Sequence, residues 1–187
     1  MNEDHTRRLR LLLLISLSVA LADQLTKLLA VRYLSSGAGD AWSRFWSQPH
    51  PAAAADRVVV TGFWSFRYAE NPAAAFGLFA RGSDQLRTTL FILAGIGGIA
   101  LFAYYLFKSP AQLRLRMLAL SLLVGGTIGN CIDHLHHPYV VDFIDWHYTE
   151  SYHWPTFNVA DVAITVAIAL LLWEAPKARR VRAAQNA

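Results

Sequence analysis

The chain has 187 residues, of which 55% are hydrophobic and 16% are charged, and its mean hydropathy is +0.30. This length fits one domain and this hydropathy argues against an ordinary water-soluble protein, so we expect a single membrane domain over residues 1–187. The net charge of +4 does not indicate nucleic acid binding, because the basic residues form three short clusters beside apolar segments. Anionic membrane lipids are the expected partners of these clusters.

The first apolar segment, residues 11–34, follows a basic cluster and is long enough to cross a bilayer as a helix. A second interpretation is a cleavable secretory signal, because Ala20-Leu21-Ala22 resembles a cleavage site. The apolar pattern resumes after Asp23, which favours a membrane span that is retained.

Asp23 and Lys27 interrupt this segment towards its C-terminal end. They are four residues apart with the acid first, which is the favourable order for an ion pair on one helix face. Charged groups inside a membrane face protein or water and are candidates for function by default. We treat both as candidate site residues; the alternative is a structural pair that fixes the helix end.

Residues 35–85 are expected to lie outside the membrane. Residues 35–51 are rich in Gly, Ser, Pro and Trp, which predicts an aqueous loop. Residues 58–61 and 63–68, on either side of Gly62, are rich in β-branched and aromatic residues, which predicts a strand pair, although such aromatics also suit a bilayer surface. Asn71 then heads an apolar stretch, either as a polar site residue or as part of a plain turn.

Three further helical spans are predicted, at residues 86–107, 115–134 and 156–173. The short connection between the first two makes them antiparallel neighbours. In the 115–134 span, Gly125, Gly126 and Gly129 allow another helix to approach closely. Residues 135–155 are expected to form a second outer segment, an aromatic-rich loop. The predicted fold class is therefore an all-α membrane protein with four transmembrane helices and a short strand pair outside the membrane.

The distribution of positive charge orients the chain. Ten of the 17 Lys and Arg residues flank the spans on one side: Arg7, Arg8, Arg10, Lys108, Arg114, Arg116, Lys177, Arg179, Arg180 and Arg182. The positive-inside rule identifies that side as the cytoplasm, so both termini are expected to be cytoplasmic. The candidate polar residues then gather at the outer ends of their helices.

Two predicted helices each carry Asn and Asp three residues apart: Asn130 with Asp133, and Asn158 with Asp161. This spacing places each pair on one helix face, so the four side chains are expected to share one polar cleft. Asp142 lies nine residues beyond Asp133, which is far enough for the chain to turn back and bring Asp142 towards Asp161.

Two carboxylates in one cleft do not both ionise easily, so one holds a proton while the other accepts a proton from water. This division of roles suits an aspartic peptidase, with Asp142 and Asp161 as the candidate pair. Cys131 is expected to be a small buried hydrophobic residue, and no Ser or Cys nucleophile has a His at a readable spacing. The main alternative is a proton or ion pathway, but that requires polar residues across the full membrane.

Five histidines near the third span suggest a metal site at first sight: His134, His136, His137, His147 and His153. Their spacing matches no metal-binding motif, and His136 and His137 are adjacent, so we expect no metal.

These motifs resemble the signal peptidase II family, the lipoprotein signal peptidases, which are four-helix aspartic peptidases of the bacterial inner membrane. The resemblance spans nearly the whole chain through four stretches in order: residues 23–27, 71–77, 125–142 and 157–161. It implies that Asp142 and Asp161 are catalytic and that an extracytoplasmic β cradle lies near residues 58–68. It also implies a polar surround of the active site, made of Asp23, Lys27, Asn71, Asn130, Asp133 and Asn158.

The implied substrate is a prolipoprotein whose cysteine already carries diacylglycerol, cut just before that cysteine near the periplasmic face. The resemblance implies no metal or other cofactor, and we expect a monomer. Three features depart from the family pattern: Ala73 replaces a usual Gly, residues 35–56 are longer than usual, and His134 replaces a usual Arg. His134 exchanges a permanent charge for a group that titrates near neutrality, so we expect it to affect substrate binding.

Overall fold

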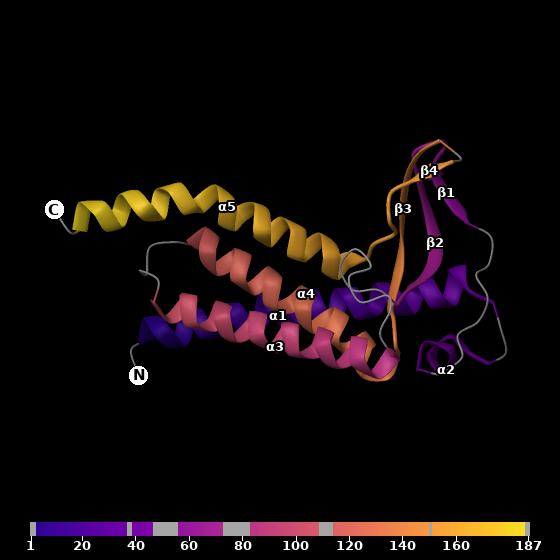
Figure 1. The fold of residues 1–187 in the computed structure, drawn as a ribbon, viewed down its shortest axis with the longest axis horizontal. Coiled ribbons are helices and arrows are strands. Elements are labelled where there is room, and N and C mark those ends of the chain that lie inside the picture. Colours follow the sequence, from indigo (N-terminus) through magenta and orange to yellow (C-terminus); the bar gives the residue numbers. More distant parts are fainter. Residues whose placement is uncertain are drawn as a thin grey trace.

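The computed structural model describes residues 3–36, 39–46, 56–72, 83–108, 114–149 and 151–185. Its long helices are α1 (Glu3–Leu34), α3 (Asp84–Lys108), α4 (Arg114–His136) and α5 (Val159–Gln185). They run lengthwise, and a small sheet and the short helix α2 (Ala41–Trp46) lie at one end (Figure 1). Both chain termini lie at the opposite end (Figure 1).

Within the described residues, two helices are long and apolar enough to cross a membrane: Thr6–Leu34 and Leu115–His136. The first exposes a series of leucines, including Leu14 and Leu17 at 62% and 59% exposure. Such an apolar surface suits contact with lipid. The helices predicted around residues 86–107 and 156–173 are also present as α3 and α5, although their crossing of the membrane stays a prediction.

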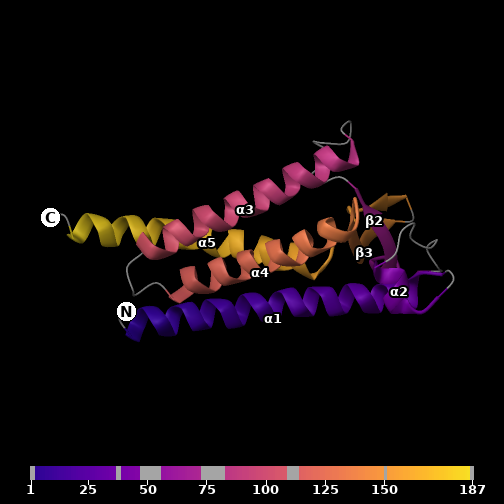
Figure 2. The same ribbon diagram turned by 90° about the horizontal axis from the view of Figure 1, so that it is seen from below.

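Helix α4 occupies the centre of the bundle and contacts α1, α3 and α5. Figure 2 shows it between α1 and α3. A Cβ atom on Gly125 would come within 2.6 Å of the Ser16 carbonyl oxygen of α1, and one on Gly126 within 2.6 Å of the Ala160 carbonyl oxygen of α5. The predicted close approach at these glycines is confirmed, and it serves two different helices.

The sheet has four antiparallel strands in the order β1 (Arg57–Val60), β2 (Trp64–Asn71), β3 (Val140–Thr149) and β4 (Tyr152–His153). The predicted strand pair around Gly62 is confirmed, and Gly62 has a φ of 73°, which favours glycine in the turn. The predicted loop at residues 135–155 is wrong over its central part. Its β-branched and aromatic residues pair with β2, a partner about 70 residues away in the chain that local patterns do not reveal.

The outer segment predicted as a loop at residues 35–51 contains α2, while residues 47–55 and 73–82 lie outside the described part of the chain. Phe45 of α2 is buried, and the carbonyl of Phe45 lies 2.7 Å from Nε2 of His137. Trp46 packs edge-on against His136 with ring centroids 4.4 Å apart. These contacts fix α2 against the end of α4.

The ends of two helices differ from the predicted spans. Helix α1 begins at Glu3 instead of residue 11, and α5 continues beyond residue 173 to Gln185. At its other end α5 begins at Val159 instead of residue 156, because Phe157 forms a bridge with Ile144 of β3. The chain therefore leaves the sheet only one residue before the helix starts.

Candidate active site

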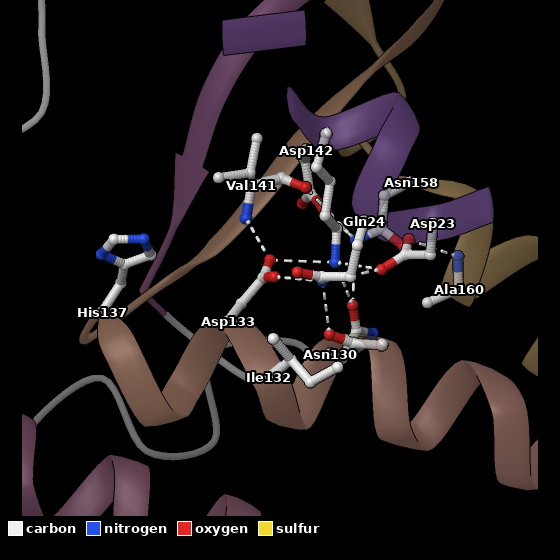
Figure 3. A network of polar contacts seen from close by, with 12 residues as sticks. Asp23, Gln24, Asn130, Ile132, Asp133, His137, Val141, Asp142, Asn158 and Ala160 are labelled. Atoms are coloured by element: carbon white, nitrogen blue, oxygen red, sulfur yellow. Dashed lines mark hydrogen bonds and ion pairs between the residues drawn. The ribbon is translucent and has the colours of Figure 1, made fainter. Parts of the chain in front are cut away.

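Most of the candidate polar residues meet in one network at the sheet end of the bundle, and Figure 3 shows part of it. Helices α1, α4 and α5 and strands β2 and β3 each contribute side chains to it. The network joins eight of the predicted residues through hydrogen bonds and ion pairs: Asp23, Lys27, Asn71, Asn130, Asp133, Asp142, Asn158 and Asp161. Residues that are up to 138 positions apart in the sequence therefore meet in one place.

Lys27 is the centre of one half of this network. Its Nζ atom lies 2.8 Å from Asp23 Oδ2 and 2.9 Å from Asp133 Oδ2, and it donates a hydrogen bond of 2.9 Å to Asn130 Oδ1. Lys27 and Asp23 are fully buried, and Asp133 nearly so. The predicted Asp23–Lys27 ion pair is confirmed, and Asp133 makes it a triad, so the buried ammonium is fully partnered.

The two acids of this triad also bind the backbone of neighbouring elements. Asp23 Oδ1 accepts a hydrogen bond of 2.9 Å from the amide of Ala160, at the start of α5. Asp133 Oδ2 accepts one of 3.0 Å from the amide of Val141 in β3. Each contact lies one residue before a candidate catalytic acid, so the triad fixes the backbone that carries Asp142 and Asp161.

Gln24 is a member of this network that we did not select from the sequence. Its Nε2 atom donates to Asp133 Oδ1 at 2.8 Å and to the carbonyl of Gly129 at 3.0 Å. It ties α1 to α4 beside the triad. Its place next to Asp23 in an otherwise apolar segment was an available signal, since a polar amide there also needs a partner.

Asp142 lies in β3 with its side chain fully buried. Asn71 donates a hydrogen bond of 3.0 Å to Oδ2, and Asn158 donates one of 2.7 Å to Oδ1. Burial, together with the negative charge of Asp161, raises the pKa of Asp142 to about 7 despite these two donors. Asp142 is therefore able to hold a proton at neutral pH.

Asp161 lies in the first turn of α5 and is partly exposed. Asn130 donates a hydrogen bond of 2.9 Å to its Oδ1 atom, and the amide of Asn158 donates one of 3.2 Å to Oδ2. In return, the amide of Asp161 donates to Asn158 Oδ1 at 2.9 Å. This reciprocal pair is a helix capping arrangement, with Asn158 as the N-cap residue.

The position of Asn158 differs from the one expected from its spacing to Asp161. Asn158 precedes α5, so Asn158 and Asp161 do not share a helix face as their spacing was taken to indicate. They meet because the side chain of the cap residue folds back onto the first turn. Asn130 and Asp133 do lie within α4, as expected.

Two asparagines link the candidate acids. Asn158 Nδ2 contacts Asp142 and also donates to Asn130 Oδ1 at 3.2 Å, while Asn130 Nδ2 contacts Asp161. In the described part of the chain, the donors to both carboxylates are amide groups. The negative charge of Asp161 also acts on Asp142, so one acid is able to hold a proton while the other stays ionised and accepts a proton from water.

His134 is buried near the end of α4, one residue after Asp133. Asp133 and Lys27 both lie close enough to interact electrostatically with its ring. Its predicted influence on substrate binding stays a prediction. Ala73, the second departure from the family pattern, lies outside the described residues.

Known proteins are similar to this chain in sequence. Residues 15–176 match the family model described as signal peptidase (SPase) II. A lipoprotein signal peptidase of Anaeromyxobacter sp. (strain Fw109-5) is 37% identical over 174 residues, covering 87% of this chain and 82% of the relative. One of Clostridium tetani (strain Massachusetts / E88) is 38% identical over 151 residues, covering 80% and 82%.

A solved structure of a bacterial membrane enzyme, determined at 2.3 Å by the in meso method, is also similar. It superposes with a TM-score of 0.68 at 26% sequence identity, covering 89% of this chain and 88% of the other. From the extent of these matches, the chain belongs to the signal peptidase II family of membrane aspartic peptidases, which cleave the signal peptides of prolipoproteins.

Proposed function

We propose that Asp142 and Asp161 are the catalytic dyad of this enzyme, which removes the signal peptide from diacylglyceryl-modified prolipoproteins by cutting just before the lipidated cysteine. The observation that carries the proposal is the bridge of Asn158 and Asn130 between two carboxylates from separate elements. A buried acid with a raised pKa beside a second, partly exposed acid is the environment that separates acid and base roles.

In the proposed mechanism, Asp142 holds the proton and donates a hydrogen bond to the scissile carbonyl oxygen. The ionised Asp161 accepts a proton from water, and the oxygen of that water attacks the carbonyl carbon. Asp161 then carries the proton that the leaving amine nitrogen needs when the C–N bond breaks. Since the dyad supplies both acid and base, this reaction uses no metal or cofactor.

The other residues of the network have supporting roles in this proposal. Asn71, Asn130 and Asn158 orient the two carboxylates through the hydrogen bonds described above. Asp23, Lys27 and Asp133 hold the backbone at Ala160 and Val141. His134, buried beside Asp133, is the remaining candidate for substrate contact.

We further propose that residues 1–187 form one membrane domain whose four spans are α1, α3, α4 and α5. The basic clusters at both termini and between α3 and α4 support a cytoplasmic position for the end opposite the sheet. The dyad is then near the periplasmic face of the bacterial inner membrane. These basic clusters interact with anionic lipid headgroups, and nucleic acid has no part in the function.

Membrane position explains how a lipidated substrate reaches the dyad. Its acyl chains stay in the outer leaflet while the peptide enters between helices, and each buried methylene contributes about 0.8 kcal/mol to binding. We infer that the enzyme acts as a monomer, because within the described residues one chain supplies both acids and asparagine donors to each of them.

The test is a cleavage assay with purified protein and a synthetic diacylglyceryl prolipoprotein. Asp142→Asn and Asp161→Asn are each expected to lower turnover by at least about 10⁴-fold, a loss typical of an essential catalytic group. Both variants should still bind the lipidated precursor and retain the helix content of the parent protein. Substantial turnover by either variant would refute the dyad, and binding without cleavage by the parent protein would indicate a catalytically inactive relative.

A further inference from the structure

A second cluster of ionisable side chains lies on the sheet, separate from the proposed dyad. Asp145 and His147 alternate along β3, so they project from the same face of the strand. His153 of β4 is the cross-strand partner of His147 in the ladder, so it shares this face. The backbone register therefore brings one carboxylate and two imidazoles together.

The side chains converge on one another. His153 Nδ1 lies 2.8 Å from Asp145 Oδ1, and His147 Nδ1 lies 3.1 Å from Asp145 Oδ2. One ligand atom from each of the three residues lies within 4.8 Å of the others, and the two imidazole centroids are 5.0 Å apart. Ligand atoms bound to one tetrahedral zinc ion at about 2.0–2.2 Å are themselves about 3.4 Å apart, so small rotations of the imidazoles suffice.

Asp145 has a hydrogen-bond donor of the kind that orients metal-binding carboxylates. Ser65, the cross-strand partner of Asp145 in β2, donates a hydrogen bond of 2.9 Å to Asp145 Oδ2 and orients the buried carboxylate. Arg67 lies on β2 with Ser65, and its guanidinium forms an ion pair with Asp56 at 2.8 Å. The His147 and His153 side chains are 13% and 29% exposed, which gives an ion access from solvent.

We propose that Asp145, His147 and His153 form a binding site for a divalent transition metal ion of the zinc type. Two imidazole nitrogens and one carboxylate oxygen are ligands that zinc prefers, with water in the fourth position. Coordination through Nδ1 leaves the ring proton on Nε2 and releases any Nδ1 proton to solvent. This site revises the expectation of no metal, since the three residues match no linear motif and are assembled by strand register.

The proposed ion would act as a structural clamp outside the catalytic reaction. Asp145 lies three residues after Asp142, and β4 leads through Phe157 to the cap residue Asn158. A metal bridge between β3 and β4 would therefore hold together the two segments that carry the dyad. The site does not depend on the proposed dyad and is tested without an activity readout.

The experiment is isothermal titration of Zn²⁺ into detergent-purified protein whose affinity tag has been removed, since a histidine tag itself binds zinc. One ion per chain is expected, with a raised unfolding temperature that Mg²⁺ does not reproduce. His147→Gln, His153→Gln and Asp145→Asn should each weaken binding at least about tenfold. His136→Gln is the matched control, because His136 is exposed at the end of α4 and should leave binding unchanged.

A second measurement needs no variant, so it still tests the proposal if the variants fail to fold. Co²⁺ added to the unaltered protein should give the visible absorption of tetrahedral cobalt, and Zn²⁺ should displace it. Absence of this spectrum, or zinc binding that the three variants retain in full, would overturn the proposal. In that case the cluster is a network of hydrogen bonds between Asp145 and the two imidazoles.

Discussion

The Lys27 triad and the Asp142–Asp161 pair each contain two buried or partly buried acids, but they differ in what lies against those acids. In the triad, one ammonium lies within 2.9 Å of both carboxylates. In the pair, the direct partners within the described residues are asparagine amides. The triad is therefore electrically compensated, while the pair is left with negative charge that a shared proton relieves.

Aspartate therefore serves two purposes within one network of polar residues. Asn130 lies between the two regions, since its carbonyl oxygen accepts from Lys27 and its amide nitrogen donates to Asp161. Asp161 therefore receives a hydrogen bond from a neutral amide that is itself bonded to Lys27, and the ammonium group does not contact Asp161 directly. The triad is thus expected to govern stability, and the pair to govern chemistry.

The largest effect is expected on removing the ammonium group of Lys27. Lys27→Met leaves Asp23 and Asp133 buried without their cation, and breaking a buried ion pair in this way costs about 3–5 kcal/mol. Thermal unfolding in detergent should show a large loss of stability. The triple change Asp23→Asn, Lys27→Met, Asp133→Asn should recover much of it, and no recovery would show that Lys27 acts through something other than charge.

Asn158→Ala tests the pair without removing an acid. The change removes both the N-cap of α5 and a donor to Asp142. Loss of the N-cap alone is expected to lower the free energy of unfolding by about 1 kcal/mol. Misplacement of the acids is expected to lower kcat by about 10²-fold. The measurement is the turnover of lipidated precursor. A variant with normal kcat and only reduced stability would show that Asn158 is a cap alone.

Gly126→Ala changes the spacing between the helices that carry the two regions. Its Cβ would lie 2.6 Å from the Ala160 carbonyl of α5, and such overpacking costs about 1–3 kcal/mol. Both unfolding temperature and turnover should fall, since Asp161 follows Ala160. Gly97→Ala is the matched control, because among the described residues no atom outside the adjoining helix backbone lies within 4 Å of its Cβ position. Equal effects of the two changes would contradict close α4–α5 packing.

A change of pH addresses the pair with the smallest perturbation. The pKa of Asp142 is raised from 3.8 to about 7, so its proton is present below that value and is lost as the pH rises through it. Single-turnover cleavage should therefore fall by about tenfold per pH unit above the apparent pKa. A rate that stays constant well above neutrality would show that no such proton is needed.

The helices and the identities of the polar residues could be predicted from the sequence, because apolar length and isolated polar groups are local signals. The strand β3 could not, since residues 140–149 become a strand only by pairing with β2. The capping role of Asn158 was missed for a related reason. A spacing of three residues fits both a helix face and a helix cap, and the bridge of Phe157 to Ile144 decides between them.

The cluster of Asp145, His147 and His153 shows the same limit. Its histidines are visible in the sequence, but the pairing of His147 with His153 depends on the register of a short hairpin. In contrast, the Asp23–Lys27 pair was accessible, because helix geometry alone places residues four apart on one face.

Infrared spectroscopy of protonated carboxyl groups detects whether Asp142 holds a single proton beside an ionised Asp161. The unaltered protein should show a protonated carboxyl band that titrates with an apparent pKa near 7. Asp142→Asn should remove that band, and Asp161→Asn should shift its titration to lower pH by removing the neighbouring charge. A band that survives Asp142→Asn unchanged, or the absence of any protonated carboxyl group below neutrality, would show that Asp142 does not hold this proton.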